Sequence, residues 1–228
     1  MRHICKFTIS ILLWICVYSI NAQNQNITDT VKIKKNNIDG LRIELDVAPV
    51  VKTLLAKGET YSFEGAVQTT LLQKYYPVVE FGYAGASKIS TDNVDFNTNG
   101  VFFRVGSDFS VMKQKENSPK NQNYFLVGGR LGFSHFTYNL SNIVIRDNYW
   151  NESKIYNFEN IPSTKLWFEI AAGIRVEVIK NIYMGWTLRN KRMLTNDADG
   201  TVSPWYIPGF GVKSTSAWAV NYAIGYQF

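Results

Sequence analysis

Bulky apolar residues alternate with polar or small residues in eight separate segments of the sequence. In the first of them, Leu41, Ile43 and Leu45 are separated by Arg42 and Glu44. A period of two indicates a half-buried β-strand, because successive side chains of a strand point to opposite faces. The eight segments are 41–47, 61–71, 79–84, 101–111, 125–134, 166–178, 182–189 and 218–228. Several reach about ten residues, the length that a tilted strand needs to cross a bilayer.

Two kinds of closed barrel fit this alternation: a soluble lipocalin-type barrel with an apolar interior, and a membrane barrel with an apolar exterior. The apolar face carries side chains such as Phe81, Trp186 and Trp218, and this set is too bulky to fit inside eight strands. The opposite face mixes charges with small residues such as Gly82 and Gly132, which suits a crowded interior. We therefore predict an all-β fold, an eight-stranded antiparallel up-and-down transmembrane β-barrel.

The predicted connections alternate in length along the chain. Those expected on the periplasmic side are 73–76, 180–181 and the longer, polar 112–123. Those expected on the outer side are all long, and they comprise residues 49–60, 87–100, 137–164 and 190–215. Short turns on one side and long loops on the other are typical of outer-membrane barrels.

Residues 1–22 have the parts of a secretory signal peptide. Arg2 and Lys6 give a basic start, residues 7–20 are mostly apolar, and Ala22 offers a cleavage point. The two early cations supply two units of the formal net charge of +6. The remaining charge is too small to argue for binding to nucleic acid.

A lipoprotein that begins at Cys16 is an alternative, although that processing requires a small residue where Ile15 stands. We expect a signal peptide at 1–22, a flexible periplasmic leader at 23–40 and an outer-membrane β-barrel at 41–228. The two cysteines, Cys5 and Cys16, both precede the expected cleavage point. The mature chain is therefore expected to hold no disulfide and no cysteine metal site. We also expect no cofactor.

Charged residues recur on the strand face that is predicted to point inward. They are Arg42, Glu44, Asp46, Glu64, Glu80, Arg104, Asp108, Arg130, Glu169, Arg175, Glu177 and Arg189. Eight strands enclose room for side chains but not for an open channel, and an unpaired buried ion costs several kcal/mol. We predict a salt-bridged plug, with a proton or small-ion path as the alternative.

Aromatic residues gather near the predicted strand ends, as expected for the two membrane interfaces. The predicted membrane-interface aromatics are Tyr75, Tyr76, Tyr124, Trp167, Trp218, Tyr226 and Phe228. The last strand closes on Phe228, which resembles the signal that the outer-membrane barrel assembly machinery reads. We therefore expect that machinery as a partner, together with outer-membrane lipid and lipopolysaccharide.

Catalytic and metal-binding signals are weak. His135 follows Ser134 directly, and adjacent strand residues point to opposite faces, so the two cannot form a nucleophile–base pair. The run from Asp197 to Gly200 resembles the start of a calcium loop but lacks the later ligands. Asp92 and Asp95, like Asp197 and Asp199, are interpreted as solvated turn residues. Trp150, Trp205 and Tyr206 are apolar for loop residues, and they either contact a partner or pack the loops together.

Two segments carry a resemblance to a family. They are 173–186, with the sequence GIRVEVIKNIYMGW, and 206–211, with the sequence YIPGFG. On these segments the chain resembles an uncharacterised family of outer-membrane barrels from Bacteroidota, which implies the barrel and no activity. We expect a non-enzymatic structural or surface-interaction protein with long outer loops. A narrow channel or transport component is the first alternative, and a lipid-modifying enzyme is the second.

Overall fold

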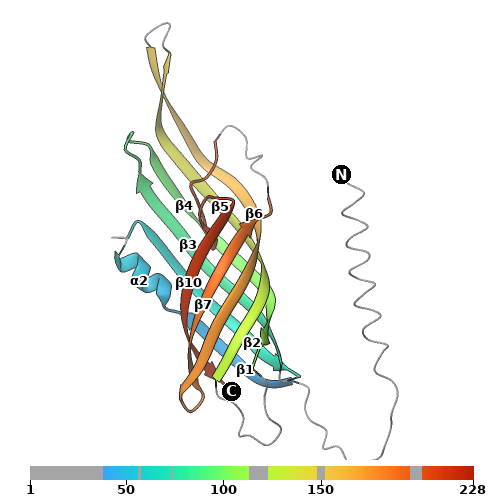
Figure 1. The fold of residues 1–228 in the computed structure, drawn as a ribbon. Coiled ribbons are helices and arrows are strands. Elements are labelled where there is room, and N and C mark those ends of the chain that lie inside the picture. The colour runs from blue at the N-terminus through green and yellow to red at the C-terminus, as the bar shows by residue number, and fades with distance from the viewer. Residues whose placement is uncertain (1–37, 56–57, 73, 113–122, 148–151, 196–201) are drawn as a thin grey trace, which may run out of the picture. The chain divides into compact units, whose positions relative to one another are not determined.

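A computed structural model describes residues 38–55, 58–72, 74–112, 123–147, 152–195 and 202–228. Eight antiparallel strands close into a barrel in the order β1-β10-β7-β6-β5-β4-β3-β2 (Figure 1). The predicted eight-stranded up-and-down barrel is confirmed. The strands are β1 (Ile38–Asp46), β2 (Thr60–Leu71), β3 (Tyr75–Ile89), β4 (Asp95–Ser110), β5 (Asn123–Asp147), β6 (Glu152–Ile179), β7 (Ile182–Met193) and β10 (Ser216–Gln227).

The period-two pattern places bulky apolar side chains outside and charges inside. On β4, Phe103 and Val105 are 44% and 46% exposed, whereas Arg104 between them is 1% exposed. Closure comes from pairing of the first and last strands, from Arg42 with Gln227 to Asp46 with Ala223. The expected signal peptide and most of the expected leader lie outside the described residues.

The hairpin of β5 and β6 projects beyond the other strands and defines the loop end of the barrel (Figure 1). The opposite end, which holds the β6–β7 turn and the C-terminus, is the turn end. The expectation of a long loop at 137–164 was wrong, because β5 and β6 stay paired as far as Asp147 and Glu152. Asn142 and Asn160 have positive φ angles of 63° and 54°, which absorb local irregularities without ending the ladder.

Three further elements occupy regions that were expected to be outer loops. Helix α2 (Ala48–Leu55) follows β1, and the short strands β8 (Tyr206–Ile207) and β9 (Gly211–Val212) pair with each other. We call residues 206–212 the plug hairpin, because Ile207 and Phe210 are 0% and 3% exposed inside the barrel. No helix in the described parts of the chain is long and apolar enough to span a membrane.

An aromatic cluster fills the interior towards the loop end. Its buried members include Phe96, Phe102, Phe136, Tyr138, Trp167, Ile207 and Phe210. This core was not expected, because the alternation had assigned the bulky residues to the outside. It closes the loop end of the barrel around the plug hairpin.

Three predicted membrane-interface aromatics point inward instead. Tyr76 and Trp167 are 2% and 0% exposed, and the Tyr124 ring packs edge-on against Tyr76 at a centroid distance of 5.4 Å. Tyr76 follows Tyr75, and only one of two adjacent strand residues can face out. The Trp167 Nε1–H donates to Glu169 Oε1 at 2.6 Å, a partner that a buried indole requires.

The other predicted interface aromatics do point outward. Tyr75, Trp218, Tyr226 and Phe228 are 44%, 70%, 46% and 68% exposed. Tyr75 and Tyr226 lie at the turn end, whereas Trp218 pairs with Asn190 in the half of the barrel nearer the loop end.

Candidate functional site

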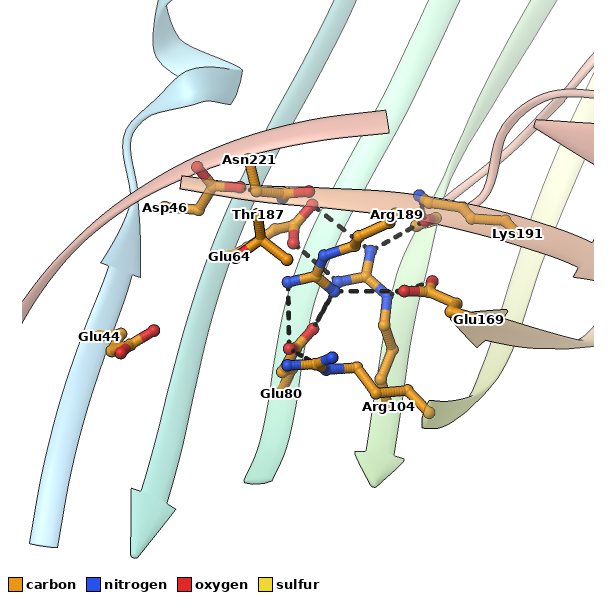
Figure 2. Close-up of polar contacts among 12 residues, drawn as sticks. Glu44, Asp46, Glu64, Glu80, Arg104, Glu169, Thr187, Arg189, Lys191 and Asn221 are labelled. Carbon is orange, nitrogen blue, oxygen red and sulfur yellow. Dashed lines mark hydrogen bonds and ion pairs between the residues drawn. The ribbon is translucent and has the colours of Figure 1, made fainter. Parts of the chain in front are cut away.

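Glu80 is buried inside the barrel and binds three arginines from three other strands, of which Arg104 and Arg189 are labelled in Figure 2. Its Oε2 accepts hydrogen bonds from Arg104 Nη1 at 2.8 Å and Arg189 Nη1 at 2.6 Å. Its Oε1 accepts from Arg130 Nε at 2.7 Å and Arg189 Nη2 at 3.1 Å. Glu80 is 3% exposed, so these guanidinium groups balance its charge. We call Glu80, Arg104, Arg130, Arg189, Glu64 and Glu169 the charge layer.

Glu64 and Glu169 complete the charge layer on the side of the loop end. Glu64 Oε2 accepts from Arg104 Nη1 at 2.8 Å. Glu169 Oε1 lies 3.0 Å from Arg104 Nε as an ion pair, and its Oε2 accepts from Arg189 Nη1 at 3.2 Å. Cations and anions alternate through space, which lets charges persist where single buried ions would be costly.

A polar chain leads from the charge layer to the turn end. Arg130 Nη2 donates to Asp108 Oδ2 at 2.9 Å, and the Gln68 amide donates to the same oxygen at 3.2 Å. Arg42 Nη1 donates to Gln68 Oε1 at 3.2 Å, and the Arg42 guanidinium lies 4.3 Å from the centroid of the Tyr183 ring.

Arg175 and Glu44 form the remaining buried ion pair of the predicted set. Arg175 Nε and Nη2 donate to the two oxygens of Glu44 at 2.9 and 3.1 Å. Arg42 Nη1 lies 3.6 Å from Glu44 Oε1 and joins this pair to the polar chain. Contacts therefore connect the predicted network, apart from two of its members.

Asp46 and Glu177 do not belong to the arginine network. Asp46 ends β1, where its Oδ1 accepts from the backbone N–H of Ala48 at 2.9 Å and of Tyr222 at 3.1 Å. Glu177 Oε1 accepts from Asn181 N at 2.8 Å in the β6–β7 turn. Both carboxylates lie beside backbone donors at strand ends, which alternation along a strand does not reveal.

The sequence reasoning missed two buried lysines. Lys165 and Lys191 are 1% and 5% exposed, and they share the inward face with Glu169 and Arg189. The apolar alternation of the outer face stops at Leu166 and Leu188, so the predicted strands ended before reaching the lysines. Their spacing could have identified them, because Lys165 and Lys191 lie an even number of residues from the inward charges Glu169 and Arg189.

The plug hairpin is bonded to the charge layer through its backbone. Gly209 O accepts from Arg104 Nη2 at 2.9 Å and from Lys191 Nζ at 2.6 Å. Gly209 has a φ of +79°, and a Cβ on it would lie 2.4 Å from the Phe102 ring, so glycine is required there. Burial raises the pKa of the Tyr206 phenol to about 12, still further above physiological pH than the ordinary value.

Free space in the described interior narrows from the loop end towards the charge layer. A cleft of about 280 Å³ opens beside the plug hairpin. Next to Glu44, Glu80 and Arg189 the space falls to about 20 Å³, enough for roughly one water. Beside Asp108 and Arg175 it falls to about 0 Å³. Little free space therefore remains at the charge layer, between the loop-end cleft and the turn end.

Ser134 and His135 face opposite sides of β5. Ser134 is 0% exposed and donates to Val101 O at 3.1 Å. His135 is exposed on the outer face, and its Nδ1 lies 3.0 Å from Thr164 Oγ1. Among the described residues, no group of three or more His, Cys, Asp or Glu side chains is arranged to hold a metal ion.

The loop residues singled out in the sequence have local roles where they are described. Trp205 stacks on Phe96 at a centroid distance of 5.2 Å, and Asp95 Oδ2 accepts from Asn142 Nδ2 at 2.8 Å. Trp150, Asp197 and Asp199 lie outside the described residues.

Solved structures with a similar fold include a major outer membrane protein from Thermus thermophilus, with a TM-score of 0.44 and 9% identity, covering 84% of this chain and 99% of that chain. Neisserial surface protein A gives a TM-score of 0.41 and 10% identity, covering 84% of this chain and 96% of that chain. The N-terminal β-barrel domain of Pseudomonas aeruginosa OprF gives 0.34 and 11%, with 83% and 97% covered. No protein of curated function matches the sequence. A family model described as a domain of unknown function, DUF6048, matches residues 4–228, and the chain belongs to this family.

Proposed function

We propose that the protein is a closed outer-membrane barrel that acts without catalysis, as a structural or surface-interaction module. The observation that carries this proposal is the apolar belt on the outside of the barrel. Phe81, Phe133, Ile170 and Trp186 are 52%, 44%, 55% and 66% exposed on four different strands. Soluble monomers rarely expose apolar patches larger than a few hundred Å², whereas lipid solvates such a belt.

The belt has a limit towards the loop end. On β4 the outward residues change from Val101 to Asn99 and Asn97, and on β5 they change from Phe133 to His135. A barrel in a bilayer shows such a band of limited height. The β5–β6 hairpin continues beyond the band, where Ile145 and Ile155 are 56% and 66% exposed. This hairpin is the surface that we propose for contact with a partner outside the cell.

The interior supports a closed state in preference to a channel. Paired charges block the space between the loop-end cleft and the turn end, and the plug hairpin adds a second obstruction. The wall of paired strands also meets a requirement of lipid, because its backbone polar groups bond to the neighbouring strands. The same proposal includes four points that rest on the sequence alone. They are export by a signal peptide, lipopolysaccharide as a surrounding lipid, assembly through Phe228, and an origin in Bacteroidota.

Conductance measured in planar bilayers tests the closed state. We expect no steady current from inserted protein, because about 20 Å³ of space beside Glu80 leaves no continuous water column. A general porin inserted by the same protocol provides the positive control. A steady, voltage-independent current from this protein would contradict the closed state and favour the narrow channel.

A further inference from the structure

The wall of the barrel is interrupted between β2 and β10. Strand β1 lies between them and pairs with both. This pairing runs from the turn end as far as Asp46, which pairs with Ala223 of β10 and Glu64 of β2. Val47 N–H still donates to Tyr222 O at 2.8 Å. Beyond that bond, residues 216–221 of β10 pair with β7 alone, and residues 60–63 of β2 pair with β3 alone, within the described chain. The half of the wall nearer the loop end therefore has a lateral opening.

Helix α2 lies across this opening and contacts both β2 and β10. Pro49, Lys52 and Thr53 line the cleft behind it, whereas Val50 and Val51 are 54% and 55% exposed. The helix therefore turns Pro49 and Thr53 towards the cleft, holds the exposed Lys52 at its rim, and presents two valines outward. It covers the opening without the continuous hydrogen bonds of a strand.

The borders of the opening are apolar on the outside of the barrel. Phe63 on β2 is 59% exposed, and Val220 and Trp218 on β10 are 56% and 70% exposed. Lys52 Nζ donates to Val220 O at 3.3 Å, so a side chain occupies a backbone acceptor at the open edge. An amphipathic molecule with its chains against this border would direct its polar head into the cleft.

The lining of the cleft holds two lysines and one carboxylate, so its charged side chains are net positive. Lys52 and Lys191 line it together with Glu64, but Glu64 is already paired with Arg104 at 2.8 Å. Lys191 Nζ donates to Gly209 O at 2.6 Å and Phe210 O at 3.2 Å. An ammonium group has three donors, and these two hydrogen bonds use two of them.

A buried acceptor also lines the cleft. Asn221 is 8% exposed, and its Nδ2 donates to Asp46. Its Oδ1 has no donor in the described part of the chain, which is costly unless a ligand or water supplies one. Ser62 and Tyr206 add hydroxyl groups to the lining. The combination of ammonium groups, hydroxyls and a free acceptor fits a phosphate that carries a hydroxyl.

We propose that the cleft binds the phosphate-bearing head of an anionic membrane lipid, which enters sideways between β2 and β10. The volume of about 280 Å³ lies at the lower limit of small-molecule sites, which begin near ~300 Å³. It therefore accommodates the head, and the acyl chains remain outside against Phe63 and Val220. This inference rests on the proposed membrane location of the barrel.

Native mass spectrometry of the purified protein, released from phosphatidylcholine nanodiscs doped with phosphatidic acid, tests this site. We expect one phosphatidic acid to be retained per chain, in preference to phosphatidylcholine. K52Q removes a cation at the rim of the cleft and is expected to weaken retention roughly tenfold, as for loss of one charge-assisted contact. S62W fills the cleft without changing charge and is expected to abolish retention.

K88Q is the matched control, because Lys88 is an exposed lysine at the loop end that pairs only distantly with Glu59, at 4.0 Å. It should retain phosphatidic acid like the unmodified protein. Equal retention in K52Q, S62W and the unmodified protein would overturn the site. Occupancy by inorganic phosphate or glycerol phosphate with no lipid retained would also overturn it. A chain that never enters the nanodisc would contradict the membrane location, whereas insertion without retention would contradict the site alone.

Discussion

Replacing Glu80 by glutamine is expected to lower the free energy of unfolding by about 3–5 kcal/mol. The substitution keeps the shape of the side chain but removes the charge that Arg104, Arg130 and Arg189 share at 2.6–2.8 Å. Three buried cations would then face fewer anions, and the glutamine N–H₂ would itself be a donor directed at donors. Urea unfolding in a fixed detergent measures the change as a lower midpoint at an unchanged slope.

E59Q is the matched control for E80Q. Glu59 makes its ion pair with Lys88 at 4.0 Å, and both side chains are more than half exposed. Exposed pairs of this kind contribute about 0–1 kcal/mol, so its unfolding midpoint should stay close to that of the unmodified protein. Equal midpoints for E80Q and E59Q would show that the charge layer does not stabilise the barrel.

Placing arginine in the apolar belt is expected to have the second large effect. V105R puts a guanidinium where Val105 is 46% exposed on the outside of β4. In a bilayer this costs about 2–4 kcal/mol near the midplane, whereas a water-exposed position would tolerate it. Refolding into phospholipid vesicles, followed by urea titration, gives the difference in the free energy of unfolding.

The β5–β6 hairpin provides the comparison for V105R. Ile145 is 56% exposed, a value similar to that of Val105, but it lies beyond the polar limit of the belt. I145R should change the free energy of unfolding by no more than about 0.5 kcal/mol, as for ordinary surface substitutions. If V105R and I145R changed the free energy of unfolding equally little, both sites would be exposed to water and the belt would not be solvated by lipid.

The alternation in the sequence was sufficient to predict the barrel, because each strand has one face towards the outside and one towards the interior. It identified Arg104 as inward and Phe103 as outward from their adjacent positions. Glycines on the inward face were also informative, since a Cβ at Gly132 would lie 2.2 Å from the Trp167 ring. Such close approaches explain why small residues alternate with bulky ones in these strands.

The alternation did not predict the aromatic core at the loop end. Phe102 and Phe103 are adjacent and both apolar, so the pattern cannot say that a second apolar surface lies inside. The plug hairpin depends on contacts between distant residues, such as Gly209 O with Arg104, which no local period encodes. The same holds for the cleft, which exists because β1 ends at Asp46 while β2 and β10 continue.

Spin labels on single cysteines test most directly whether lipid surrounds the barrel. A chain with Cys5 and Cys16 replaced by serine has no other cysteine, so one label can be placed in turn at Phe81, Val105 or Asn97. In bilayers, we predict that labels at Phe81 and Val105 collide often with oxygen and rarely with a water-soluble nickel complex, and that the label at Asn97 does the reverse. Belt labels as accessible to nickel as the label at Asn97 would contradict the account.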